Sequence, residues 1–158
     1  MKRLHIHLSV KDLEKNITFY NNLFGQEPTV VKDDYVKWLI DEPAVNFAIS
    51  NRENREGLNH LGLQTDQDEE LQEIGQRLEE AEIKTTSQEN TACCYSESNK
   101  HWSFDPQGIP WECFNTLKDI PTFGNGSGEV PAQPKEGSAC SIPSIPWNIS
   151  KGKGLGCC

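Results

Sequence analysis

The first third of the chain alternates between strand-like and helix-like patterns of apolar side chains. In residues 4–10, LHIHLSV, apolar and polar positions alternate, which is the period of a strand with one buried face. Residues 13–24 carry apolar side chains at helical spacing, with Asp12 in place for an N-cap and Gly25 for a C-cap. Three short strands are predicted after this helix, near residues 28–32, 35–41 and 45–50.

The same order of patterns returns in the second third of the chain. Residues 59–65, NHLGLQT, predict a strand that again contains a histidine near its start. The acidic residues between Asp66 and Glu70 suit the positive end of a helix dipole, and the apolar stripe from Leu71 to Leu78 predicts the helix itself. Three more strands are predicted near residues 83–88, 101–104 and 109–114, the last two joined by the turn DPQG.

The chain therefore shows a βαβββ pattern twice, with a period of about 55 residues. Laying His5 on His60 superimposes the two patterns, although few residues are identical. Internal duplication of this kind is a fold-level signal. It predicts an α+β domain over residues 2–116, made of two paired modules at about residues 2–52 and 57–116.

Residues 117–158 differ in composition from this domain. They hold 12 of the chain's 21 glycines and prolines and show neither helical nor strand periodicity. Such a composition predicts a flexible tail. The tail ends in the adjacent pair Cys157 and Cys158, which is its one chemically distinctive feature.

The composition restricts the classes of partner. The chain has a formal net charge of -9 and a pI of about 4.9, and such a surface repels phosphate backbones and anionic lipids. No apolar run approaches the roughly 18 residues of a spanning helix. The N-terminus, MKRLHIHLSV, lacks the long apolar region of a signal peptide. Binding to nucleic acid or to a membrane is therefore not expected, and the predicted location is the cytoplasm.

Six cysteines are many for a chain of 158 residues, and four of them stand in adjacent pairs. Neighbouring Cα atoms lie about 3.8 Å apart, below the roughly 4.4–6.8 Å that is usual for disulfides. No CxxC pair is present, which argues against a zinc ribbon. The pairs are therefore expected to be reduced thiols, either incidental or binding something thiophilic. The six are Cys93, Cys94, Cys113, Cys140, Cys157 and Cys158.

Three residues could form a metal site. His5 and His60 occupy equivalent places in the repeat, and equivalent strands of a duplicated sheet can meet about a pseudo-two-fold axis. Glu112 would complete a set of two imidazoles and one carboxylate, which favours non-haem Fe(II), with Mn, Zn, Ni or Co as other candidates. The alternative is three unrelated polar residues on the solvent face of a sheet. His7 is expected to support the site or to be solvated, and His101 to occupy an exposed hairpin position.

The pair Cys93 and Cys94 suggests a second kind of ligand. Neighbouring strand residues point to opposite faces, so both thiols can reach one atom only where the backbone leaves strand geometry. The surrounding segment, ENTACCYSESNK, is polar enough to form a loop, and a looped dithiol can chelate a soft centre such as trivalent arsenic, Cd²⁺ or Hg²⁺. The alternative is one buried and one exposed cysteine. Cys113 is expected to face the opposite way from Glu112, into a core.

Several segments together resemble a known superfamily. HIHLSVKDLEKNITFYNNLFG, NHLGLQT and DPQGIPWECF are similar to signature segments of the vicinal oxygen chelate superfamily, which includes glyoxalases, extradiol dioxygenases and fosfomycin-resistance proteins. Within it, TACCYSESNKHWSFDPQGIPWE resembles the carbon–arsenic lyases of arsenic-resistance operons and their cadmium-induced relatives. The resemblance covers about residues 2–116, and the tail segment TFGNGSG with the cysteine-rich end is also similar.

The resemblance implies a vicinal oxygen chelate domain and a defined reaction. Members of this subgroup are Fe(II)-dependent dioxygenases that use O₂ to cleave the C–As bond of trivalent organoarsenicals such as methylarsonous acid, giving arsenite and formaldehyde. Carried over by position, the metal ligands would be His5, His60 and Glu112. Cys93 and Cys94 would bind the arsenic on a loop that closes over the site.

Two other functions stay open at this point. A protein that only sequesters arsenite or cadmium through its thiols would not need the metal triad. A glyoxalase or extradiol dioxygenase acting on a carbon substrate would give Cys93 and Cys94 no purpose. The tail pair Cys157 and Cys158 would be an auxiliary metalloid-binding arm, and the chain is expected to be a monomer or a homodimer.

Overall fold

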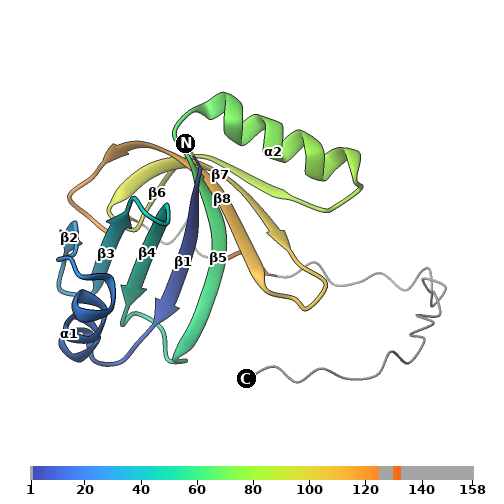
Figure 1. The fold of residues 1–158 in the computed structure, drawn as a ribbon. Helices are drawn as coiled ribbons and strands as arrows, with labels where there is room; N and C mark the ends of the chain where they lie inside the picture. The colour runs from blue at the N-terminus through green and yellow to red at the C-terminus, as the bar shows by residue number, and fades with distance from the viewer. Residues whose placement is uncertain (1, 125–129, 133–158) are drawn as a thin grey trace, which may run out of the picture.

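The computed structural model describes residues 2–124 and 130–132. Its fold is one curled sheet of eight strands in the order β2-β3-β4-β1-β5-β8-β7-β6, with two helices packed on it (Figure 1). The sheet mixes parallel and antiparallel neighbours, which confirms the predicted α+β class. The elements are β1 (Arg3–Ser9), α1 (Leu13–Phe24), β2 (Val30–Val31), β3 (Tyr35–Ile40), β4 (Val45–Ser50), β5 (Gly57–Thr65), α2 (Asp68–Glu80), β6 (Thr86–Cys93), β7 (Ser96–Phe104) and β8 (Pro110–Asp119).

The two predicted modules lie side by side in the sheet, the first as β2-β3-β4-β1 and the second as β5-β8-β7-β6. They meet through the antiparallel pair of β1 and β5, where His5 lies opposite Gly62 and His7 lies opposite His60. Adding the 55-residue period exchanges these two pairs, so His5 and His60 occupy equivalent positions about a pseudo-two-fold axis. The repeat in the sequence is therefore a repeat in the structure.

Helix α1 covers the first module, and it begins and ends where the sequence predicts. The Asp12 side chain accepts a hydrogen bond from the Lys15 backbone N–H, and Gly25 ends the helix with a φ of 67°. This left-handed conformation costs little for glycine, which explains why the helix stops there. The apolar side of α1 packs on a buried core formed by Val36, Trp38, Ile40, Phe47 and Ile49.

Helix α2 covers the second module over a smaller core. Its first turn is acidic, which favours the positive end of the helix dipole as predicted. Leu71 and Ile74 are buried against Cys113 of β8. Cys113 therefore faces the helix, whereas the adjacent Glu112 lines a cavity elsewhere, in agreement with strand alternation.

The β6–β7 hairpin differs from the sequence prediction. The segment around the cysteine pair, predicted as a loop, is mostly strand, because β6 runs to Cys93 and β7 starts at Ser96. The strand predicted near residues 83–88 begins later, and Ile83 is exposed. Pairing with β7 satisfies the backbone of this polar segment, so tertiary context overrides its weak strand propensity.

The end of the domain also differs from the prediction. Strand β8 continues to Asp119, so the chain beyond residue 116 begins as part of the sheet. Among the described residues, no helix is long and apolar enough to cross a membrane. The oligomeric state and the cytoplasmic location stay predictions. The rest of the predicted tail, residues 125–129 and 133–158, lies outside the described residues, and with it Cys140, Cys157 and Cys158.

Candidate metal and thiol site

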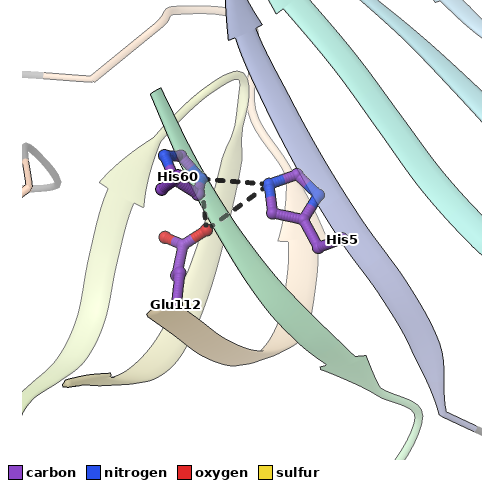
Figure 2. A group of neighbouring side chains, drawn as sticks. All are labelled: His5, His60 and Glu112. Carbon is purple, nitrogen blue, oxygen red and sulfur yellow. Dashed lines mark hydrogen bonds and ion pairs between the residues drawn. The ribbon is translucent and has the colours of Figure 1, made fainter. Parts of the chain in front are cut away.

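Three buried side chains converge from three central strands. His5 comes from β1, His60 from β5 and Glu112 from β8, and each is at most 5% exposed. Their ligand atoms point toward one another (Figure 2). The two Nε2 atoms are 3.1 Å apart, and Glu112 Oε2 lies 3.3 Å from His60 Nε2 and 3.7 Å from His5 Nε2. The structure thus brings together the three residues that the repeat and the last strand singled out; we call them the donor cluster.

The hydrogen bonds behind the two imidazole rings fix their tautomers. His5 Nδ1 donates to the Asn46 backbone carbonyl at 3.0 Å, so the His5 proton is on Nδ1. His60 Nδ1 lies 2.6 Å from Asn59 Oδ1, and the amide nitrogen of Asn59 donates to Glu53, which fixes the orientation of the amide. Both Nε2 atoms therefore present lone pairs to each other and to a carboxylate. Two ring nitrogens and one carboxylate oxygen arranged in this way could bind a metal ion between them.

The spacing of the donor cluster also fits one metal ion. Ligand atoms about 2.1 Å from a metal lie roughly 3.0–3.4 Å apart in octahedral or tetrahedral coordination, and the observed separations are 3.1–3.7 Å. Burial and the neighbouring His60 lower the pKa of His5 to about 4, so its ring is neutral and able to bind a metal near neutral pH. Two imidazoles and one carboxylate suit several first-row divalent metals.

A buried lysine completes the surroundings of the carboxylate. Lys100 of β7 is 4% exposed, and its Nζ donates to Glu112 Oε1 at 2.5 Å. Burial alone would raise the pKa of Glu112, but the Lys100 ammonium group outweighs it and holds that pKa well below its usual value. Glu112 is therefore an ionised carboxylate with one oxygen on the lysine and the other directed at the histidines.

His7 lies beside the donor cluster without joining it. Its Nε2 hydrogen-bonds to Ser50 Oγ at 3.0 Å, and its ring is edge-on to the His60 ring with 4.9 Å between centroids. Burial lowers the pKa of His7 well below its ordinary value. Of the two alternatives that the sequence left open, the structure therefore excludes a solvated His7 and gives it a supporting contact with His60.

The cysteine pair stands at the turn between β6 and β7. Cys94 and Tyr95 have φ values of 56° and 63°, so the backbone leaves strand geometry there, as the dithiol hypothesis requires. The two Sγ atoms are 2.9 Å apart, which is too far for a disulfide bond of about 2.05 Å. Their mutual hydrogen bond lowers the pKa of Cys93 and raises that of Cys94, which burial raises further. Of the two thiols, Cys93 is therefore the one that loses its proton more readily.

The two thiols share a cavity with two residues of the donor cluster. Its lining includes both cysteines together with His5, Glu112 and Lys100, and its volume is about 30 Å³. A wider opening is lined by both cysteines and by His60. The sulfur ligands of the cysteine pair and the nitrogen and oxygen ligands of the donor cluster therefore border connected space. One small molecule can contact both kinds of ligand.

Two other candidates lie away from this cavity. His101 is not the exposed hairpin residue that was predicted, because its Nε2 is buried under α2, where any side chain at Gly75 would meet it. Its Nδ1 hydrogen-bonds to Ser87 Oγ at 2.9 Å. Burial raises the pKa of Cys113 to about 11, so this thiol is a core residue rather than a ligand.

The sequence matches one protein family over residues 2–113, described as the Glyoxalase/Bleomycin resistance protein/Dioxygenase superfamily. The chain belongs to this superfamily. The match spans both modules and includes the whole donor cluster. The Mn(II)-bound glyoxalase from Novosphingobium aromaticivorans shares the superfamily fold with a TM-score of 0.55 and 18% identity, covering 76% of this chain and 42% of that chain.

Relatives of higher identity carry narrower names. A trivalent organoarsenical cleaving enzyme from Bacillus sp. (strain MD1) is 43% identical over 123 residues, which are 76% of each chain. The cadmium-induced protein CadI from Mycobacterium bovis is 34% identical over 141 residues, 89% of this chain and 93% of that protein. This superfamily member is therefore similar to proteins named for organoarsenical cleavage and cadmium induction, as the segment around the cysteine pair predicted.

Sequence reasoning missed the residues that orient the ligands. A signal existed for Lys100, because it alternates with Trp102 on the buried face of β7. A signal existed for Asn59 as well, since an amide next to a histidine can fix its tautomer. Asn46 acts on His5 through its backbone carbonyl, which no residue type reveals.

Proposed function

We propose that the protein is an Fe(II)-dependent dioxygenase that cleaves the C–As bond of trivalent organoarsenicals, with methylarsonous acid as the representative substrate. One observation carries this proposal: a vicinal dithiol and two residues of the buried donor cluster, His5 and Glu112, line the same cavity. Thiols favour arsenic, and a set of two imidazoles and one carboxylate favours a redox-active divalent metal. The similarity to a trivalent organoarsenical cleaving enzyme over most of the chain supports the same reaction.

In this proposal Cys93 and Cys94 capture the substrate. Two S–H groups and two As–OH groups exchange for two As–S bonds and two water molecules, so the step needs no oxidant. Cys93 attacks first because its pKa is lowered, so it forms the nucleophilic thiolate more readily than Cys94 does. The proton of the Sγ–Sγ hydrogen bond is available to a departing hydroxide, which leaves as water. The arsenic is then held in the cavity that His5 and Glu112 of the donor cluster also line.

The donor cluster would hold the iron. His5 and His60 offer their Nε2 lone pairs, and Glu112 offers Oε2 while Lys100 occupies its other oxygen. Bound Fe(II) would supply the activation of O₂ beside the captured arsenical. The reaction balances without an added reductant, because methylarsonous acid and one O₂ together contain the atoms of arsenous acid and formaldehyde. Holding both reactants in one small cavity contributes to the rate through proximity.

The test is an arsenite assay with the reduced, full-length protein. Fe(II), air and methylarsonous acid should together yield arsenite and formaldehyde in equal amounts, and omission of iron or oxygen should abolish both products. Cys113→Ser is the matched thiol control and should stay active, since Cys113 lies under α2 and outside the cavity. A protein with bound iron that forms no arsenite would contradict the proposal.

A second candidate function is sequestration of arsenite or cadmium by the thiols without turnover. The dithiol favours it by itself, and so does the similarity to a cadmium-induced protein. It requires the turn between β6 and β7 but not the donor cluster, so His60→Ala separates the two functions. Sequestration should survive that substitution, whereas cleavage should be lost. A reaction on a carbon substrate would instead leave Cys93→Ser and Cys94→Ser fully active.

A further inference from the structure

Residues 120–124 follow β8 and lie against the cysteine turn. In Figure 1 they are the orange chain beyond the arrowhead of β8. The Ile120 N–H donates to the Tyr95 backbone carbonyl at 2.9 Å. Gly124 has a φ of 105°, and a Cβ at this residue would lie 1.9 Å from the Ala92 carbonyl oxygen. The segment therefore packs directly on the backbone that leads into the dithiol.

Phe123 of this segment contacts side chains from other parts of the chain. The guanidinium carbon of Arg52 lies 3.6 Å from the centre of the Phe123 ring. The rings of Tyr95 and Tyr35 are edge-on to it, with centroids 5.6 Å and 6.3 Å away. Cation–π and edge-to-face contacts are both favourable, so the ring is held from three sides.

Asp34, in the connection between β2 and β3, joins the same group of residues. Tyr95 Oη donates to Asp34 Oδ1 at 2.6 Å, and Arg52 donates to Asp34 Oδ2. The Asp34 hydrogen bond raises the pKa of Tyr95 to about 12, so the phenol keeps the proton that this bond needs. These contacts connect the first module to the dithiol turn of the second. We refer to Asp34, Arg52, Tyr95 and Phe123 as the clamp.

The dithiol turn needs such support because of its backbone. Cys94 and Tyr95 both have positive φ values, a conformation that residues with a side chain seldom adopt unless their surroundings hold them. Tyr95 carries the clamp's contacts to Asp34 and Phe123, so the clamp acts on the residue next to Cys94. The 2.9 Å separation of the two thiols depends on this turn keeping its shape.

We propose that the clamp positions the two thiols for bidentate binding of trivalent arsenic, with Phe123 as its principal positioning residue. This inference rests on the proposed function for the identity of the ligand. Without the clamp, the turn would relax toward conformations in which the thiols separate, and binding would lose its preorganisation. The donor cluster is held by β1, β5 and β8, which are not part of the clamp, so metal binding should not change.

The test measures arsenical binding to metal-free, full-length protein that carries Cys157→Ser and Cys158→Ser, so that the tail pair cannot chelate. Calorimetric titration with methylarsonous acid should give a Kd roughly tenfold higher for Phe123→Ala. Phe123→Tyr keeps the ring and should bind like the wild type. Phe19→Ala is the matched control, because Phe19 is a 60% exposed aromatic residue on α1. Equilibrium dialysis against Co²⁺ should give the same Kd for Co²⁺ in all variants.

Wild-type arsenical affinity in folded Phe123→Ala would overturn the proposal. If that variant does not fold, Arg52→Met takes its place, since the Arg52 side chain is 41% exposed and lies outside the core. A several-fold higher Kd for the arsenical in Arg52→Met would support the clamp. An unchanged Kd would overturn it, and so would loss of Co²⁺ binding in this variant. The titration contains neither iron nor oxygen, so its result does not depend on turnover. A failure to form arsenite in the separate assay would therefore contradict the proposed lyase function and not the clamp.

Discussion

Replacement of Lys100 by methionine should destabilise the metal-free protein by about 3 kcal/mol. Methionine keeps much of the apolar stem but removes the charge from a side chain that is 4% exposed. The buried Glu112 carboxylate would stay in the interior without the ammonium group that lies 2.5 Å away. Breaking a buried ion pair from one side costs about 3–5 kcal/mol. The lower end applies because methionine keeps the packing of the apolar stem, so that only the loss of charge contributes.

Urea unfolding of metal-free protein measures this loss. With a slope of about 2 kcal/mol per molar, the midpoint should fall by roughly 1.5 M. Lys118→Met is the matched control, because Lys118 is 62% exposed and its pair with Glu97 should contribute less than about 1 kcal/mol. Equal midpoints for the wild type and Lys100→Met would refute the reasoning that a charged pair is buried at this position.

Two conditions should reduce the difference in unfolding free energy between the wild type and Lys100→Met. The folded-state pKa of Glu112 is lowered, so the wild-type pair stabilises above the unfolded-state pKa and loses that contribution as the pH falls through the folded-state pKa. In the variant the carboxyl group can protonate, so the difference should shrink below about pH 5. Saturating Co²⁺ should also shrink it, because a bound cation replaces the missing charge. A difference of unchanged size in Co²⁺ would contradict a metal-binding role for Glu112.

Three further predictions separate substrate capture from metal binding. Cys94→Ser should weaken methylarsonous acid binding by about tenfold or more, because one As–S bond is lost, while Co²⁺ affinity stays unchanged. Gly62→Ala should abolish Co²⁺ binding but not arsenical binding, since a Cβ at residue 62 would lie 1.9 Å from the Glu112 carbonyl oxygen and displace β8. The rate of arsenical capture should rise with pH to a midpoint below that of an ordinary cysteine, because the pKa of Cys93 is lowered; a stopped-flow midpoint above about 8.5 would contradict Cys93 as the thiolate.

The sequence predicted those features that depend on local chemistry or on the repeat. Asp12 begins α1 by accepting a hydrogen bond from a backbone N–H, and Gly25 ends it by adopting a positive φ. Both effects are properties of single residues. The pairing of His5 with His60 followed from duplication, because equivalent strands of two similar modules meet at the pseudo-two-fold axis. Glu112 was proposed only as the carboxylate of the last strand, and it converges on the histidines because β8 lies parallel beside β5.

Features that depend on distant contacts could not be predicted in this way. The polar β6 segment is a strand because β7 pairs with it, and its own residues favour a loop. The ion pair of Lys100 with Glu112 requires the register of β7 against β8, which alternation alone does not give. Phe123 was assigned to a flexible tail by composition, and only the arrangement of Arg52 and Tyr95 in space gives it a binding position.

The duplicated fold offers two equivalent histidines but one carboxylate, and the strand registers explain why. His7 lies beside Ala48 across β1 and β4 in the same way that Gly62 lies beside Glu112 across β5 and β8. In the first module the larger side chain of this pair, His7, is on β1, and its neighbour on β4 is Ala48. In the second module β5 carries Gly62, and the neighbour on β8 is Glu112. A carboxylate at residue 48 would make the cluster symmetric and would add a fourth protein ligand. With alanine at residue 48, only three protein donors surround the metal position, so coordination positions stay open. A metal that must also bind oxygen or substrate needs such open positions.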